Sequence, residues 1–452
     1  MNKNNQNKPN IIWFMFDSLR NEFLNEFGCI EAERNFVDEL ISQGVSFTNC
    51  HGTAPFTIVS MASKMTGCYP SLNYLDGWLK KDPTKTLNPL CLSIPEILRY
   101  NGYYTCYMSS SDACTYVNPQ GFDYYHAEMG YTNFDFNHYI DHKGPKFIYM
   151  DFGELHDYCC KKSYDCTKQD FLEGIKMTVK YIKEFYEKIK TDNDFIILTS
   201  DHGMRTNQDF KGLKYAKESV TGRYLTEATT RNSFNLIWRN HLIPQKINDM
   251  CRSVDMMPTI LDILGIEYPR LDGVSLTPLL RGEKVNIQYS YSLTGWSMTH
   301  PKYPGVWCVR DHQYKLVIEE HIHGLKKYVT KELFDYINDK EEAIDLSNSL
   351  PEKFEELNKE ADKMLFTKRD IMKLYKAQKF NIDDYIIFRK NHLNSKALEI
   401  ARKIITINWQ KGCRKNFLVK YYKFRLGSVL YWQFPFLYTL ALKLGKGKNT
   451  RF

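Results

Sequence analysis

The sequence has few of the features that mark fibrous, disordered or secreted proteins. Its 452 residues include only 24 Gly and 16 Pro, and 43% are hydrophobic. This composition excludes a collagen-like or intrinsically disordered chain and is sufficient for a substantial core. The opening residues, MNKNNQNKPN, contain no apolar stretch. We therefore expect no secretory signal peptide and a cytoplasmic location, with the inner face of the membrane as a peripheral site.

The twelve cysteines lack the paired spacing of structural zinc sites. In a cytoplasmic protein we expect reduced thiols rather than disulfides. Cys159, Cys160 and Cys166 form one cluster, and His156 lies near it in the sequence. Because a C-x2-C pair is missing there, the spacing weighs against zinc at this cluster.

Acidic residues are scarce only near the C-terminus. From Arg389 to Phe452 there are fifteen Lys or Arg residues and a single acid, Glu399, whereas residues 1–388 contain 46 basic and 52 acidic residues. Such a local excess predicts an interaction segment. No recognition motif for nucleic acid accompanies it, so we expect no nucleic-acid partner.

The basic segment also contains many aromatic and aliphatic residues. Its most apolar part, 426–442, contains Gln433 and Pro435 and is flanked by Lys and Arg, which makes it marginal for a spanning helix. We favour an interfacial helix on an anionic membrane surface, with Trp and Tyr at the level of the headgroups. The alternative is a pair of helices packed against the acidic body of the protein.

Continuous apolar runs predict strands that are buried on both faces of a parallel sheet. Helical segments lie between them, and each ends near a glycine. Strands and helices alternate, so we expect an α/β fold. The runs cover residues 10–16, 146–152 and 194–200, and the helices residues 36–43, 58–66 and 94–100.

The second half of the chain has a different pattern. Short aromatic and β-branched runs over residues 286–346 predict a small antiparallel sheet, and the charged segment 351–379 predicts a helix. We therefore expect a catalytic α/β domain over residues 9–285, a small α+β subdomain over 286–365 and a basic, aromatic-rich helical tail over 366–452.

Ionisable residues follow two of the predicted strands directly. Asp17 follows the first, and Asp201 with His202 follows the third. The C-terminal edge of an open α/β sheet is where ligands bind. Two carboxylates and an imidazole there suit Ca²⁺, Mg²⁺, Mn²⁺ or Zn²⁺. The alternative is that Asp17 caps a helix and that Asp201 and His202 belong to a simple turn.

Thr57 lies directly before the predicted helix 58–66. A threonine at this place is typical of an N-cap hydroxyl, which requires no chemistry. The alternative is a nucleophile, because the free N–H groups at a helix N-terminus bind an oxyanion and a nearby metal lowers the pKa of a hydroxyl.

In order along the chain, these segments resemble the sulfatase family of the alkaline phosphatase superfamily. The resemblance covers roughly residues 9–350 and implies a mixed, mostly parallel sheet flanked by helices, with a small antiparallel C-terminal subdomain. It also implies that Asp17, Asp201 and His202 are metal ligands, and that Thr57 is the nucleophile and contacts the metal. It is carried by PNIIWFMFDSLR, FVDELISQGVSFTNCHGTAPFTIVSMASKMTGCYPS, SIPEILRYNGYYT, GFDYY, FIILTSDHG, TEATTRNSFNLIW, SVDMMPTILDILGI, LDGVSLTPLLRGE and ELFDYINDKEEAIDL.

The chain departs from the family pattern at the nucleophile. Sulfatases of this family have a Cys or Ser there, within C-x-P-S-R, that is oxidised to formylglycine, whereas this chain has Thr57 and, four residues later, Met61. We therefore expect no formylglycine. The paired Asp-Asp after the first strand is Asp17-Ser18 here, and MSSS over residues 108–111 replaces G-K-W-H.

The segment MDFGELHD contains the candidates for a second set of ligands or for substrate contacts. Asp151, Glu154 and His156 occupy positions that resemble the family's His-x-x-Asp-x-His pattern, and only the last His is retained. We assign His156 to catalysis, as the group that protonates the leaving oxygen or contacts the oxyanion. We include Ser60 among the substrate contacts and leave Lys214 and Arg223 outside the assigned site.

These observations predict a metal-dependent hydrolase or transferase with a threonine nucleophile. We expect it to act on phosphate-type esters, by phosphodiester hydrolysis or by transfer to a glycan or lipid-linked acceptor. One alternative is a sulfuric ester hydrolase without formylglycine. The other is a non-catalytic binding protein that keeps the fold, which Ser18 and the incomplete second site suggest.

Overall fold

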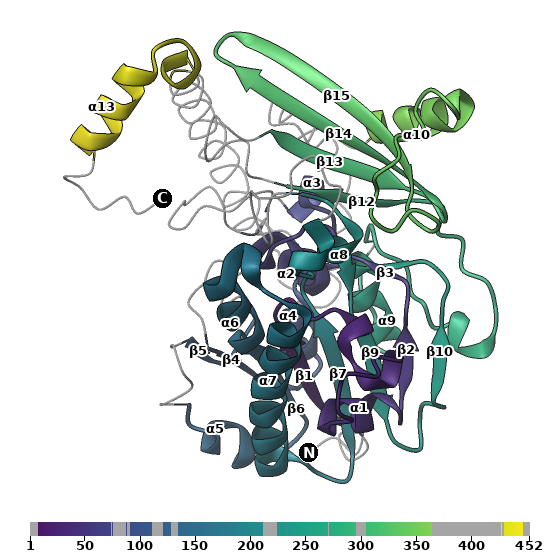
Figure 1. Ribbon diagram of the computed structural model, residues 1–452. Coiled ribbons are helices and arrows are strands. Elements are labelled where there is room, and N and C mark those ends of the chain that lie inside the picture. Colours follow the sequence, from purple (N-terminus) through teal and green to yellow (C-terminus); the bar gives the residue numbers. More distant parts are fainter. Residues whose placement is uncertain are drawn as a thin grey trace, which may run out of the picture.

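The computed structural model describes residues 8–73, 75, 87, 91–110, 121–127, 134–210, 224–269, 271–294, 304–363, 426 and 429–445. Within these residues the chain forms a large α/β part and a smaller antiparallel sheet that lies above it in Figure 1. The predicted α/β class is thereby confirmed. The predicted domain boundaries stay predictions, and Lys214 and Arg223 lie outside the described residues.

The central sheet has eight strands in the order β10-β2-β9-β7-β1-β6-β4-β5. Neighbouring strands are parallel except at β9, which runs antiparallel to β2 and β7. The three predicted strands are confirmed residue for residue and form the middle of the sheet. The strands are β1 (Asn10–Phe16), β2 (Val45–Phe47), β4 (Tyr104–Ser109), β5 (Tyr124–Ala127), β6 (Lys146–Phe152), β7 (Asp194–Ser200), β9 (Phe234–Trp238) and β10 (Gln245–Ile247).

The register brings the ends of β1, β6 and β7 level with one another. Phe16 pairs with Phe152 of β6 and with Ser200 of β7. The residues that follow these strands therefore leave the sheet at the same edge. Because parallel strands place their carboxyl ends together, Asp17 and Asp201 meet although 184 positions separate them.

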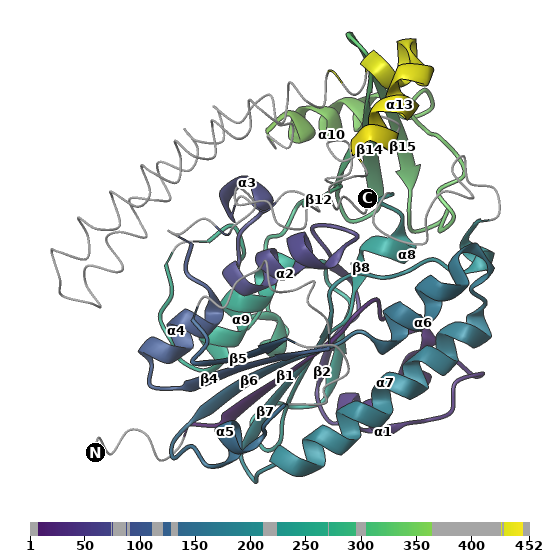
Figure 2. The ribbon, with the colours of Figure 1, turned by 90° about the vertical axis from the view of Figure 1, so that its left-hand side faces the viewer.

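Alternate residues of β1 point into two separate cores, because successive side chains of a strand face opposite sides. Ile11, Trp13 and Met15 pack with α2, α4 and α9. Ile12, Phe14 and Phe16 pack with α6 and α7 on the other face, and Figure 2 shows the two helical layers on opposite sides of the sheet. The helices are α1 (Phe36–Ile41), α2 (Thr57–Thr66), α3 (Pro70–Asn73), α4 (Ile94–Tyr100), α5 (Asn137–Ile140), α6 (Glu154–Lys162), α7 (Lys168–Ile189), α8 (Glu227–Thr230), α9 (Met256–Ile263), α10 (Pro351–Lys363) and α13 (Pro435–Gly445).

Two of the predicted helices differ from the structure at one end. The helix predicted over 36–43 ends at Ile41, because the N–H groups of Gln43 and Gly44 bond to carbonyls three residues back and tighten the last turn. The helix predicted over 58–66 begins one residue earlier, at Thr57, and ends at Thr66 as predicted, followed by Gly67 in the left-handed conformation.

The small C-terminal sheet is antiparallel, as predicted, in the order β12-β13-β14-β15. Helix α10 packs on one side of it, with Leu357 and Ala361 in the same core as Leu316 and Leu333. A further sheet of very short strands lies beside the central one, in the order β11-β3-β8. The strands of these two sheets are β3 (Cys50–His51), β8 (Arg231–Asn232), β11 (Cys251–Arg252), β12 (Ser290–Leu293), β13 (Gly305–Arg310), β14 (Tyr314–His323) and β15 (Lys326–Asp335).

The predicted tail is described only over residue 426 and residues 429–445, which include α13. None of the helices in the described part of the chain is long and apolar enough to cross a bilayer. The ten cysteines within the described residues all have free thiols.

Candidate active site and metal centre

Asp17, Asp201 and His202 form a compact cluster at the edge where β1 and β7 end. One ligand atom from each residue lies within 4.8 Å of the other two. Nε2 of His202 is 3.3 Å from Oδ2 of Asp201 and 3.7 Å from Oδ1 of Asp17. Within the described residues this is the one group of three such side chains this close together, and Cys159, Cys160 and Cys166 do not form another.

A hydrogen bond at Nδ1 orients the ring of His202 so that Nε2 faces the two carboxylates. Nδ1 of His202 lies 2.8 Å from the carbonyl oxygen of Gly203, which can only accept, so Nδ1 carries the proton. Nε2 is therefore the ring nitrogen that faces the carboxylate oxygens. Such a donor set is favourable when a cation lies between its members, and a histidine bound in this way to a backbone carbonyl is a frequent metal ligand.

Asp201 also has an oxygen that is suited to a metal. Its Oδ1 accepts hydrogen bonds from the backbone N–H groups of Ser18 (3.0 Å) and His202 (2.8 Å). Its Oδ2 is buried and has no hydrogen-bond donor among the described residues. A buried carboxylate oxygen without a donor is costly unless a cation satisfies it. The residues present therefore fit a divalent metal, as the sequence suggests, and oxygen and imidazole ligands are compatible with all four candidate ions.

The electrostatics of the two carboxylates differ. Burial, and then the neighbouring Asp201 carboxylate, raise the pKa of Asp17 to about 7. Burial also opposes ionisation of Asp201, but His202 and Lys64, together with hydrogen bonds from Ser18 and Thr57, hold its pKa below the ordinary value. Asp201 is therefore the permanent anion of the pair, and a cation would have to displace a proton from Asp17.

Ser18 supports both carboxylates from the position where the family pattern has a second Asp. Its hydroxyl donates to Oδ1 of Asp17 at 2.8 Å, and its N–H donates to Asp201. Its φ of 69° lies in the left-handed region, which is uncommon for a residue other than glycine and is found at functional sites. The serine thus orients two carboxylates instead of supplying a third.

Thr57 is the first residue of α2, not its N-cap. Phe56 occupies the N-cap position, and no side chain caps the helix. The side chain of Thr57 instead lies beside the carboxylate of Asp201, where it helps to lower the pKa of that carboxylate, and only 5% of the residue is exposed. The positive end of the helix and its N-terminal N–H groups thus lie next to the carboxylate cluster, which is the arrangement expected of an oxyanion site.

Of the other predicted site residues, His156 lies near this cluster. The ring of His156 lies 6.4 Å from that of His202, and its Nδ1 is 3.2 Å from Oδ1 of Asp157. Burial would lower the pKa of His156, but the charge of Asp17 and the contacts with Asp157 and Cys160 raise it well above the ordinary value. A protonated imidazole beside the cluster is suited to bind an anion or to donate a proton.

Asp151, Glu154 and Ser60 do not complete a second group of ligands within the described residues. Asp151 is the sixth residue of β6, and its Oδ2 accepts from the Ser109 hydroxyl at 3.0 Å. Glu154 begins α6. Ser60, which we expected to contact substrate, is fully buried and donates its hydroxyl to the carbonyl oxygen of Asp201, so it holds the turn between β7 and the cluster.

Lys64 is a component of the site that the sequence analysis missed. It lies two helical turns after Thr57 on α2, is 1% exposed, and donates from Nζ to the carbonyl oxygen of Ser200, next to Asp201. Burial lowers its pKa to about 8, opposed chiefly by the charge of Asp201. The spacing of seven residues from Thr57 was the available signal, because residues i and i+7 share a helix face.

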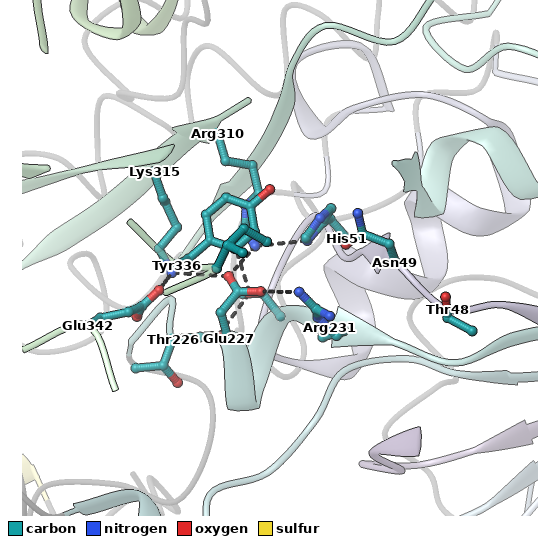
Figure 3. Close-up of polar contacts among 12 residues, drawn as sticks. Thr48, Asn49, His51, Thr226, Glu227, Arg231, Arg310, Lys315, Tyr336 and Glu342 are labelled. Carbon is teal, nitrogen blue, oxygen red and sulfur yellow. Dashed lines mark hydrogen bonds and ion pairs between the residues drawn. The ribbon is translucent and has the colours of Figure 1, made fainter. Parts of the chain in front are cut away.

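A second buried polar cluster holds the segments that frame the site. Figure 3 shows Arg310 and Lys315 of the small sheet directed at Glu227 of α8, with His51 on the far side. Glu227 forms ion pairs with Arg310, with Lys315 at 3.3 Å and with Arg231 at 3.1 Å. None of these residues was singled out from the sequence, since their spacing shows no motif.

Helix α8 connects this polar cluster to the group formed by Asp17, Asp201 and His202. The carbonyl oxygen of Ala228 lies 2.1 Å from the position that a Cβ of Gly203 would take, so only glycine fits there. The N–H of Gly203 donates to Thr229, and the N–H of Gly52 donates to Thr230. The turn that contains Asp201 and the segment that leads to Thr57 are therefore both bound to one short helix.

Comparisons with known proteins identify the family and the fold of this chain. The Sulfatase family model matches residues 9–266, and the model described as N-sulphoglucosamine sulphohydrolase, C-terminal, matches residues 220–370. An N-acetylgalactosamine-6-O-sulfatase of Bacteroides thetaiotaomicron is 30% identical over 104 residues, 23% of this chain and 20% of that protein. An ulvan-active sulfatase of Formosa agariphila is 23% identical over 346 residues, 69% of this chain and 66% of that protein. The matches thus span less than two thirds of the length of these relatives.

Solved structures with the same fold include enzymes for two kinds of ester. The structure of a 2-O glycosaminoglycan sulfatase has a TM-score of 0.60 at 18% identity and covers 79% of this chain and 91% of that one. A phosphonate monoester hydrolase of Agrobacterium radiobacter has a TM-score of 0.57 at 14% identity and covers 82% and 96%. Because the Sulfatase model matches more than half of the chain, this protein belongs to the sulfatase family, whose members are hydrolases with the alkaline phosphatase-like fold.

Proposed function

We propose that this enzyme hydrolyses sulfate esters of a saccharide, with the Thr57 hydroxyl as the nucleophile. The observation that carries the proposal is the position of Thr57, which begins α2 and lies beside Asp201 of the Asp17, Asp201 and His202 cluster. The relatives with printed activities are sulfatases, and one is named for a sulfated amino sugar. This reading replaces our sequence-based preference for phosphate-type esters as the main one.

In the proposed reaction, the Asp201 carboxylate orients the Thr57 hydroxyl and accepts its proton. The Thr57 oxygen attacks sulfur, the bond between sulfur and the sugar oxygen breaks, and protonated His156 donates a proton to the leaving alcohol. The N–H groups of α2 and the cation of Lys64 offset the charge of the sulfuryl oxygens. A divalent metal bound by Asp17, Asp201 and His202 would supply Lewis-acid stabilisation of the same charge.

Threonine imposes a different second step from that of an oxidised nucleophile. A formylglycine hydrate has two hydroxyls, so its ester can release sulfate by elimination, whereas threonine has one. The ester on Thr57 must therefore be cleaved by a second attack at sulfur, by water or by an acceptor hydroxyl. We therefore expect cleavage of the sulfate ester on Thr57 to be slow and to limit the rate of turnover.

A second candidate is the phosphate-type reaction, by hydrolysis or by transfer to a glycan or lipid-linked acceptor. The same single hydroxyl favours it, because double displacement at phosphorus needs only one nucleophilic oxygen. The fold neighbour that hydrolyses phosphonate monoesters supports the same chemistry.

The two candidates are distinguished by a covalent-labelling experiment. The protein is incubated with Mn²⁺, Ca²⁺, Mg²⁺ or Zn²⁺ and with paired aryl sulfate, aryl phosphonate and phosphodiester substrates, quenched, and analysed by peptide mass spectrometry. We expect a sulfuryl adduct on Thr57 together with alcohol release. A phosphoryl adduct alone would establish the second candidate, and metal binding without release from any ester would support the non-catalytic alternative.

The nucleophile is tested by a matched pair of variants. Thr57→Ala removes the hydroxyl, so we expect loss of both adduct and turnover. Thr57→Ser keeps the hydroxyl and should retain measurable turnover. Full activity of Thr57→Ala would exclude Thr57 as the nucleophile.

A further inference from the structure

The tip of the β14–β15 hairpin lies next to the segment that leads into helix α13, and both carry exposed apolar side chains. The ring centroids of His323, at the end of β14, and of Trp432, just before α13, lie 3.9 Å apart. The side chain of Gln433 lies 3.0 Å from the place where a Cβ of Gly324 would be, in the turn of the hairpin. Figure 1 shows the start of the yellow segment next to the tip of this hairpin, with α13 extending away from it, at the end of the molecule opposite α1.

The side chains on this surface are apolar but remain in contact with solvent. Phe436 is 77% exposed and Leu325 is 74% exposed. Helix α13 has the sequence PFLYTLALKLG, which is apolar around most of its circumference. A helix of this kind is normally covered by protein or lipid. The other exposed members are Tyr328, Val329, Trp432, Phe434, Leu437 and Leu440.

We propose that this hairpin and helix α13 dock the enzyme on the surface of an anionic lipid bilayer. Three observations select this partner. The chain from Arg389 to Phe452 has fifteen basic residues and one acid, so it is attracted to negative charge. The exposed set contains Trp and Tyr, which favour the headgroup region. The hairpin itself contributes Lys326 beside its exposed apolar residues, whereas Lys327 forms an ion pair with Glu320.

The dimensions favour a helix that lies along the surface. The eleven residues of α13 extend roughly 16 Å, about half of the hydrocarbon thickness of a bilayer. Burial of one apolar face to the depth of the headgroups is the usual arrangement for such a helix. The hairpin tip would enter the same layer, because its exposed residues adjoin Trp432.

The inference goes beyond the proposed reaction and can be tested without it. Purified full-length protein is mixed with phosphatidylcholine vesicles, with or without phosphatidylglycerol, and the bound fraction is measured by flotation. We expect binding to the vesicles that contain phosphatidylglycerol and weaker binding at high salt. Absence of binding to both vesicle types would overturn the proposal.

Paired substitutions locate the surface. Phe436→Ser with Leu440→Ser changes α13, and Leu325→Ser with Tyr328→Ser changes the hairpin. The control is Ile30→Ser with Ile243→Ser, since these side chains are 90% and 79% exposed elsewhere. We expect each test pair to lower the vesicle partition coefficient by about tenfold or more and the control to leave it unchanged. Because all six side chains are at least partly in solvent, circular dichroism and thermal unfolding should match the wild-type protein.

Two results would contradict the proposal. Equal vesicle binding by the test pairs and the control would place the contact elsewhere. A dimer in sedimentation that the test pairs convert to a monomer, without any vesicle binding, would show that the surface joins two copies of this chain.

Discussion

Arg310 of β13 donates from Nη1 to Nδ1 of His51 across 2.9 Å, although 259 positions separate the two residues. Arginine can only donate, so Nδ1 of His51 is the acceptor and Nε2 carries the proton. That Nε2 is buried and has no partner among the described residues. The contact fastens the small sheet to the segment that leads into α2, and so to the position of Thr57.

Removing Arg310 should destabilise the whole protein. Arg310→Met leaves Glu227 buried with less compensation, and breaking a buried ion pair typically costs about 3–5 kcal/mol. We expect a corresponding decrease in the free energy of unfolding, measured with urea. Arg231→Met is the control, because Arg231 pairs with the same carboxylate but is about a third exposed, and we expect a loss of about 1 kcal/mol or less. Equal losses in the two variants would contradict this account.

Neutral His51 should make the protein sensitive to mild acid. Burial, and then the charge of Arg310, hold the pKa of His51 well below its ordinary value, with smaller contributions from Arg231 and Lys315, while the charge of Glu227 opposes this shift. The unfolded chain therefore binds a proton near pH 6.5 that the folded chain does not, and stability is complete above this pH and decreases below it.

The contribution of His51 can be isolated with one substitution. His51→Asn keeps an acceptor for Arg310 and removes the titration. The free energy of unfolding of this variant should fall less than that of the wild-type protein between pH 7 and pH 5. If the free energy of unfolding depends on pH in the same way in both proteins, protonation of His51 does not destabilise the folded state and the prediction is wrong.

Metal binding should depend on a single oxygen of Asp201. Asp201→Asn keeps Oδ1, which accepts from Ser18 and His202, and replaces the unsatisfied Oδ2 by an amide nitrogen. In the wild-type protein, a divalent ion at about a hundred times its Kd should stabilise the fold by about 2.7 kcal/mol. We expect this increase in Tm to disappear in the variant. Asp151→Asn is the control, and loss of the metal effect there as well would make Asp151 a ligand.

Lys64 should act as the charge partner of the carboxylates. Lys64→Met removes the cation that lies against Asp201, so the carboxylates lose compensation and the metal-free protein should be less stable. Because a bound divalent ion supplies the missing charge, the increase in Tm on metal addition should be larger in Lys64→Met than in the wild-type protein. Lys64→Arg keeps the charge, and a metal effect as large as that of Lys64→Met would indicate a role in packing alone.

The sequence by itself determined the framework of this protein. Burial on both faces requires continuous apolar runs, so β1, β6 and β7 were predicted to the residue, and the polar residues after them marked the edge where Asp17, Asp201 and His202 meet. The order of the motifs also identified the family that the comparison confirms. These features depend on local patterns and on the general geometry of parallel sheets.

Only the tertiary structure decided which residues from other segments lie next to Asp17, Asp201 and His202 at the edge of the sheet. A threonine before an apolar helix is compatible with a cap or a nucleophile, and only the packing of α2 against β7 turned Thr57 toward Asp201 and brought Lys64 beneath it. Likewise, nothing local relates His51 to Arg310 or Trp432 to His323. Contacts between distant segments depend on how the sheets and helices pack. The residues next to a buried charge in the sequence therefore do not indicate which side chain will pair with it.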